Sequence, residues 1–178
     1  MIIKIFKGKK IKVREINYND LKRAKEFLDY INSFIEEKAK ILINKKLTLE
    51  EERKWIEKAL KEKRRKERIM LIAQEGKKIV GITSVTLKKG RQSHVGEFGI
   101  SVRREYRGMG LGKFLMKEVL KLAKKRLKPK IIRLSVFANN KIAQSLYKKF
   151  GFKKIAKIPK QIHYKRKFVD EIVMIKEI

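Results

Sequence analysis

The chain has 178 residues, 43% of them hydrophobic, and carries 50 basic against 19 acidic side chains for a formal net charge of +31. This apolar content excludes a disordered chain, and the length predicts a single domain over residues 1–178 with its own core. No apolar run approaches the ~20 residues of a membrane span, and there is no signal-peptide pattern. The absence of cysteine excludes disulfides, cysteine-ligated metals and a thiol nucleophile. We therefore expect a cytoplasmic protein.

The N-terminal part predicts one strand followed by three helices. Residues 11–16 alternate apolar and polar side chains, as a first strand does. A helix follows, with its apolar face at Leu21, Ala24, Phe27, Leu28 and Ile31, and a second short helix is expected over 34–43. A capping box from Thr48 to Glu51 starts the third helix, whose apolar stripe is Trp55, Ile56, Ala59 and Leu60.

The C-terminal part predicts strands and helices that alternate. We expect a hairpin from 68–74 and 78–87, a strand over 93–102, a helix over 110–126, a strand over 131–137, a helix over 141–149 closed by Gly151, and last strands over 152–158 and 168–176. A connection over 159–167 is expected to join these last strands. Together these elements predict an α/β fold, a sheet with helices on both faces.

A glycine-rich turn lies between the strand ending near residue 102 and the helix beginning near residue 110. Its glycines, at 108, 110 and 112, fit neither a Walker loop nor a dinucleotide fingerprint, but Arg107, Gly110 and Gly112 form the pattern Arg-x-x-Gly-x-Gly. Glycines let the backbone approach a ligand, and the first turn of a helix offers free N–H groups, so the turn predicts an anion site suited to a diphosphate. A tight turn without a ligand is the alternative.

A second motif, Asn-x-x-Ala-x-x-Leu-Tyr-x-x-x-Gly-Phe, runs from Asn140 to Phe152. Tyr147 lies about two helical turns after Asn140, so both side chains are expected on one face of the helix. In this order, the two motifs resemble those of the GCN5-related N-acetyltransferase (GNAT) family. The resemblance implies a mixed, mostly antiparallel twisted sheet of about six to seven strands, acetyl-CoA as the cosubstrate and no metal.

The resemblance also implies roles for individual residues. The main chain of Ile100, Ser101 and Val102 is expected to pair with the pantetheine arm, and Asn140 to bond to the pantetheine or acetyl region. Tyr147 is expected to act as the general acid toward the coenzyme A thiolate. Arg107 occupies the family's Arg or Gln position. Backbone N–H groups are expected to hold the pyrophosphate, from Gly108, Met109, Gly110, Leu111, Gly112 and Lys113.

The general base and the acceptor contacts follow less directly. Ser135 stands where one branch of the family has a glutamate, so we expect Glu97, on the strand before the glycine-rich turn, to act as the base. An ion pair between Glu97 and a lysine is the alternative. His163 and Tyr164, expected in the last connection, are candidates for substrate contact, and a plain surface loop is the alternative there.

Two functions remain open at this point. The first is an acetyl-CoA-dependent N-acetyltransferase acting on a primary amine, either a protein N-terminus or lysine, or a small amine. The second is a non-catalytic module that binds coenzyme A or RNA. The charge of +31 favours anionic partners, with ribosome or RNA association as the alternative to a solvated, thermophile-like surface. No membrane partner is expected, and a monomer and a homodimer both remain possible.

Overall fold

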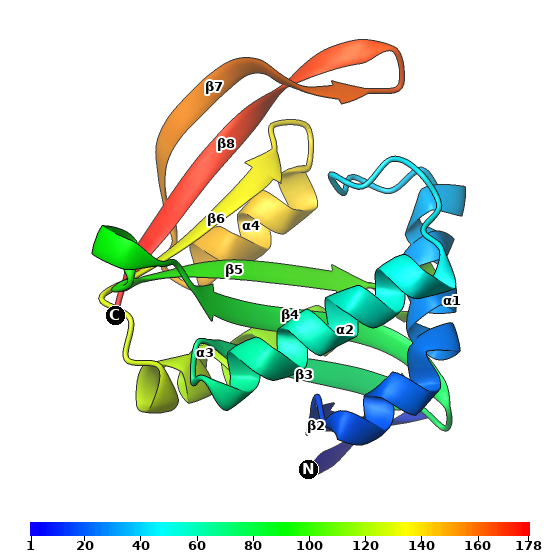
Figure 1. The fold of residues 1–178 in the computed structure, drawn as a ribbon. Coiled ribbons are helices and arrows are strands. Elements are labelled where there is room, and N and C mark those ends of the chain that lie inside the picture. Colours follow the sequence, from blue (N-terminus) through cyan, green and yellow to red (C-terminus); the bar gives the residue numbers. More distant parts are fainter.

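An eight-stranded sheet in the order β1-β2-β3-β4-β5-β6-β8-β7 organises the computed structural model, which describes residues 1–178 (Figure 1). All neighbouring strands are antiparallel except β5 and β6. The strands are β1 (Ile2–Phe6), β2 (Lys9–Glu15), β3 (Arg68–Glu75), β4 (Lys78–Leu87), β5 (Val95–Val102), β6 (Ile131–Phe137), β7 (Lys153–Tyr164) and β8 (Lys167–Glu177). The predicted α/β class is confirmed, with one strand more than the upper expectation.

Helices cover both faces of the sheet (Figure 1). They are α1 (Ala24–Glu36), α2 (Leu49–Arg64), α3 (Leu111–Arg126) and α4 (Lys141–Lys149), and a 3-10 helix, η1 (Tyr18–Arg23), precedes α1. Helices α1 and α2 enclose one core with residues such as Phe27 and Ile56, whereas α3 and α4 pack on the other face with residues such as Leu115 and Tyr147. We call these the α1/α2 face and the α3/α4 face. None of the helices is long and apolar enough to cross a membrane.

The predicted helix over 34–43 is wrong. Helix α1 continues to Glu36, and Lys38 then adopts φ +50°. The Ala39 N–H bonds to the Phe34 carbonyl and the Lys38 N–H to the Ile35 carbonyl. These two hydrogen bonds form a Schellman motif, which ends a helix and normally has glycine at the left-handed position. Because lysine and not glycine occupies that position, nothing in the sequence indicates that the helix ends there.

The last hairpin is longer than predicted, and strand β1 was not predicted at all. Strand β7 runs without a break to Tyr164 through Pro159, so the expected connection over 159–167 is wrong. Proline is tolerated because β7 is an edge strand, and its pairing with β8 shifts register between Ile158 and Ile162. At the other edge, β1 pairs with β2 around a turn at Lys7 and Gly8.

Candidate active site

Strands β5 and β6 pair over only a short length and then separate. Their parallel pairing runs from Val95 opposite Ile131 to Glu97 opposite Arg133, after which β6 pairs only with β8 and β5 only with β4 (Figure 1). The side of β5 that faces β6 therefore has no strand partner from Phe98 onward. An extended ligand can add to such a free edge by backbone hydrogen bonds.

The glycine-rich turn lies at the end of this free edge. No backbone carbonyl accepts a hydrogen bond from the N–H groups of Gly108 to Lys113, and the first bond of α3 runs from the Phe114 N–H to the Gly110 carbonyl. These free N–H groups at a helix N-terminus form a cradle for an anion. A diphosphate therefore fits the residues present.

The glycines are required by backbone conformation here. Gly108 has φ +69° and Gly110, the N-cap of α3, has φ +89°, a region that side chains with a Cβ rarely adopt. Gly112 lies where an added Cβ would be in ordinary contact with Val102 at 3.9 Å and Leu146 at 4.0 Å. The turn is thus packed between the end of β5 and α4.

Other residues predicted around the turn have partners within the protein. The Arg107 guanidinium bonds to the Val102 carbonyl at 2.7 Å and pairs with Glu37 at 2.7 Å, so it fixes the turn to the end of α1. Leu111 and Met109 pack into or against the core of the α3/α4 face, and only their N–H groups can serve a ligand. Lys113 is exposed, and its ammonium is free to approach an anion.

Tyr147 lies on the α3/α4 face next to the free edge of β5. Its ring is buried edge-on against Phe98, with centroids 5.9 Å apart, and tilted against Phe152 at 6.2 Å. Burial raises the pKa of Tyr147 to about 12. The phenol is therefore protonated at neutral pH, and because it makes no hydrogen bond within the protein, it is free to donate one to a ligand.

Asn140 begins α4, the helix that carries Tyr147. Its side-chain oxygen accepts a hydrogen bond from the Ala143 N–H at 3.3 Å, as an N-cap does. At the other end, the Gly151 N–H bonds to Lys148 and the Phe152 N–H to Tyr147, which completes a Schellman motif around Gly151. These caps fix the position of the Tyr147 ring relative to β5.

The opposite face of β5 is open. Because Phe98 lies on the α3/α4 face, Glu97, Gly99 and Ser101 lie on the α1/α2 face, and Ser101 bonds there to the Tyr30 hydroxyl of α1. Gly99 is exposed, and an added Cβ would meet no atom within 4 Å. We call this open space above Gly99 the acceptor cleft, after the role that we propose for it. Glu97 lies beside it, with its carboxylate 3.7 Å from the Lys88 ammonium, which is the pairing that the sequence left as the alternative.

The tip of the last hairpin reaches the segment between α1 and α2. The Tyr164 ring packs edge-on against Phe137, with centroids 5.5 Å apart, and its hydroxyl donates to the Lys38 carbonyl at 2.7 Å. His163 is exposed and stacks on Phe168 at 5.4 Å. Tyr164 thus joins β7 to the segment between α1 and α2, whereas His163 points outward.

Sequence reasoning missed two residues of the α1/α2 face. Tyr30 bonds to Ser101 at 2.8 Å and accepts the Ile82 N–H at 3.0 Å, which ties α1 to β4 and β5, and its burial raises its pKa. Glu52 is only 4% exposed and makes no hydrogen bond or ion pair. Its signal was available, because a glutamate one turn before Ile56 interrupts the apolar stripe of α2.

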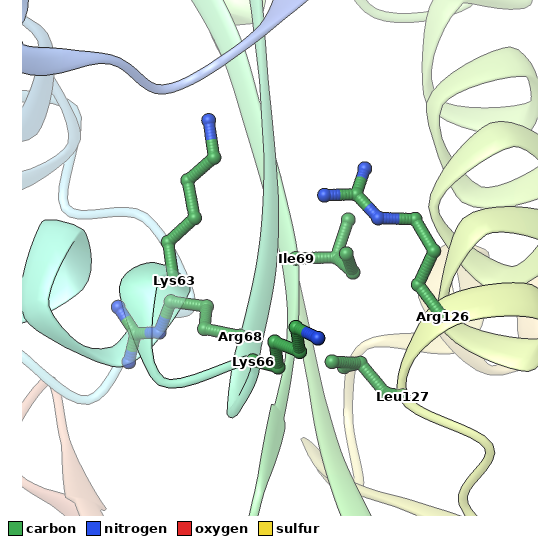
Figure 2. Close-up of a pocket in the computed structure, with 6 residues that line it drawn as sticks. All are labelled: Lys63, Lys66, Arg68, Ile69, Arg126 and Leu127. Atoms are coloured by element: carbon green, nitrogen blue, oxygen red, sulfur yellow. The ribbon is translucent and has the colours of Figure 1, made fainter.

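A separate pocket of about 210 Å³ lies at the other end of the sheet, lined by Lys63, Lys66, Arg68, Ile69, Arg126 and Leu127 (Figure 2). Arg126 and Lys63 share Glu15, at 2.6 and 3.7 Å, and Arg68 lies 2.9 Å from Glu62. Two carboxylates therefore compensate half of the charge of its four cationic side chains, and the pocket is not part of the glycine-rich turn.

Comparison with known proteins assigns this arrangement to a family. The sequence profile of the acetyltransferase (GNAT) family matches residues 31–152, a stretch that includes the turn, Tyr147 and the free edge of β5. The chain belongs to the acetyltransferase (GNAT) family. A solved GNAT acetyltransferase from Streptococcus pneumoniae superposes with a TM-score of 0.83 at 26% identity, over 94% of this chain and 99% of that one.

Two curated acetyltransferases match a shorter part of this GNAT chain. It is 35% identical over 75 residues to the L-amino acid N-acetyltransferase AaaT of Escherichia coli (strain K12), covering 42% of this chain and 46% of the relative. It is 36% identical over 77 residues to a probable spermine N(1)-acetyltransferase of Bacillus subtilis subsp. natto. This match covers 43% of this chain and 45% of the relative. The chain thus spans about half the length of the curated relatives it matches.

Proposed function

We propose that the protein is an acetyl-CoA-dependent N-acetyltransferase that transfers the acetyl group to a primary amine by direct attack. The acceptor is a protein N-terminus, a lysine or a small amine. The observation that carries this proposal is the free edge of β5, which ends in the unbonded N–H groups of Gly108 to Lys113. Family membership and the activities of the two curated relatives, on an amino acid and on spermine, support it.

The donor side of the site is the free edge and the turn. In this proposal, the N–H groups of Gly108 to Lys113 bind the pyrophosphate, and the main chain of Ile100 to Val102 binds the pantetheine arm. Asn140, at the start of α4, bonds to the pantetheine or acetyl region. Acetyl-CoA brings a thioester carbonyl that an amine can attack.

Tyr147 is the proposed general acid. Its neutral phenol can donate a hydrogen bond to sulfur as negative charge develops there, and burial strengthens that bond by excluding water. The C–S bond breaks with its electron pair on sulfur, which takes the proton. The ring packing against Phe98 and Phe152 holds the hydroxyl in one place.

Attack also needs the acceptor amine in its deprotonated form. A carboxylate on the α1/α2 face can take that proton, since the acceptor cleft opens there. Glu97 meets this requirement by position, as the sequence predicts, but the Lys88 ammonium competes for its carboxylate.

The test is turnover of purified protein with acetyl-labelled acetyl-CoA and a fractionated cell extract. Label in acid-precipitable material identifies a protein acceptor, and label in the soluble fraction identifies a small amine. No label in either fraction, with coenzyme binding intact, would contradict the proposal in favour of a coenzyme A-binding module.

RNA or ribosome association is the second candidate function. The net charge of +31 favours it, and Lys66, in the pocket of Figure 2, has no carboxylate partner. Filter binding to RNA across salt concentrations tests it, because each phosphate contact steepens the slope of log affinity against log salt by about 0.7 for single strands. A flat salt dependence would exclude this function.

A further inference from the structure

The first turn of α2 lies beside α1, on the same face of the sheet as the open side of Gly99. Asn32 of α1 clamps Leu47 by two hydrogen bonds, at 3.2 and 2.9 Å, just before α2 begins. Two residues earlier on α1, Tyr30 bonds to the end of β5 and to β4. In Figure 1, α2 crosses the sheet with its first turn beside α1, and its last turn is fixed at the start of β3 by the pair of Glu62 and Arg68.

Glu52 occupies the sheet-facing position of that first turn. It lies one helical turn before Ile56, which is fully buried against the sheet, so its side chain projects toward the same side. The residue is 4% exposed, and no donor or cation reaches its carboxylate. Because nothing opposes desolvation, the pKa of Glu52 rises to about 7.

Five charged or titratable side chains near α2 or on β5 are already engaged. Each bonds to or pairs with a group of the protein: Tyr30 with Ser101, Asp29 with Arg103, Asp20 with Arg14, Arg68 with Glu62 and Glu97 with Lys88. Glu52 differs from these because it is only 4% exposed and has no partner. An unpaired carboxylate in such a site is unfavourable for folding, so we expect a ligand to supply its partner.

We propose that Glu52 binds the protonated acceptor amine in the cleft above Gly99 and receives its proton before acetyl transfer. This inference rests on the proposed function and extends it. The acceptor then enters as an ammonium ion, although the molecule carries a large positive charge. Glu97, beside the cleft and paired with Lys88, contributes attraction for the incoming cation and not the proton transfer.

The reaction balances as follows. Glu52 takes one proton from the ammonium, the nitrogen lone pair forms the C–N bond, and the C–S bond breaks with its electrons on sulfur. Tyr147 gives its proton to sulfur and is reprotonated, through solvent, by the second proton leaving nitrogen. Glu52 releases its proton to solvent, so one proton is produced for each acetyl group transferred.

Steady-state kinetics with an amino-acid amide, spermine and a short peptide with a free N-terminus test this assignment. We expect Glu52→Gln to lower kcat at pH 7 by about 100-fold or more, with acetyl-CoA affinity unchanged. The loss should shrink toward pH 10, where free amine needs no base. Glu50→Gln makes the same change at an exposed position of α2 and should stay within about twofold, since exposed charges contribute little.

Two kinetic results would overturn the assignment. One is a Glu52→Gln protein that keeps its kcat at pH 7 with an amine that the parent acetylates. The other is a Glu97→Gln protein that loses kcat and recovers it at high pH while Glu52→Gln does not, which would return the proton transfer to Glu97. A Glu97→Gln protein with a raised amine KM and a normal kcat supports it.

A parent protein that is inactive on all three amines and transfers no label in the extract assay would contradict the proposed function and still leave Glu52 open to test. Infrared spectra at pH 7 resolve the protonated carboxyl that differs between the parent and Glu52→Gln. If adding each amine together with coenzyme A removes that band, ammonium binding at Glu52 stands. If no amine changes it, the assignment fails.

Discussion

Burial raises the pKa of both Tyr147 and Glu52, but it prepares them for different roles, a proton donor and a proton acceptor. Burial keeps the Tyr147 phenol protonated, as a donor requires, and raises the pKa of Glu52 to about 7, where a carboxylate can accept a proton from an amine near neutral pH. The sequence predicted the first because Tyr147 belongs to a motif. It did not predict the second: the position of Glu52 one turn before Ile56 was visible, but the burial of its side chain is created by α1 and the sheet.

Replacing Tyr147 by Phe separates acid catalysis from packing. The phenyl ring keeps its contacts with Phe98 and Phe152, so the midpoint of thermal unfolding should change little. Without the hydroxyl, kcat should fall by about 100-fold or more while the Kd for acetyl-CoA stays constant. Unchanged turnover would refute the acid role, and a matched Tyr164→Phe variant should affect the acceptor KM more than kcat.

The stability of Glu52→Gln relative to the parent should depend on pH. The folded-state pKa of Glu52, about 7, lies above the ~4.3 of an unfolded chain, so between these values the folded state binds more protons. The parent therefore loses stability as pH rises from about 4 to 7, by roughly 4 kcal/mol in total, and the variant escapes this loss. Urea unfolding at pH 5 and pH 8 measures it, and a pH-independent difference would contradict the buried, unpaired carboxylate.

At the scale of elements, local signals predicted what they control. The Thr48 capping box, the glycines around α3 and the Gly151 cap each act within a few residues, and α2, α3 and α4 begin and end close to prediction. Errors arose where tertiary context decides. Lys38 ends α1 in a conformation usually taken by glycine, and Pro159 continues a strand only because β7 is at an edge of the sheet.

The turn before α3 depends on glycine conformation, and two matched variants test this. Gly110→Ala and Gly8→Ala both place a Cβ at positive φ, +89° and +81°, with no atom within 4 Å, so both should lose about 1–2 kcal/mol of stability. Only Gly110 precedes the free N–H groups of α3. Gly110→Ala should therefore weaken coenzyme A binding by about tenfold, or ~1.4 kcal/mol, in a calorimetric titration. Equal affinity in the two variants would show that the turn does not bind the coenzyme.

At the scale of the whole molecule, the charge of +31 acts on the two proposed substrates with opposite sign. Acetyl-CoA is a polyanion and is attracted, whereas an ammonium acceptor is repelled by the general field and held only by local carboxylates such as Glu52 and Glu97. The sequence predicted the field and a role for Glu97 but not one for Glu52, because neighbouring charges in space come from different elements.

Salt should therefore move the two Michaelis constants in opposite directions. Raising ionic strength from about 0.05 to 0.5 M shortens the screening length from more than 10 Å to a few Å. We expect the KM for acetyl-CoA to rise several-fold, while the KM for a singly charged amine falls or stays constant because its general repulsion is screened. A neutral osmolyte at matched osmolality controls for solvent effects. If both constants rise together, short-range attraction to the cleft carboxylates outweighs the general field, and the molecule's charge does not oppose the acceptor.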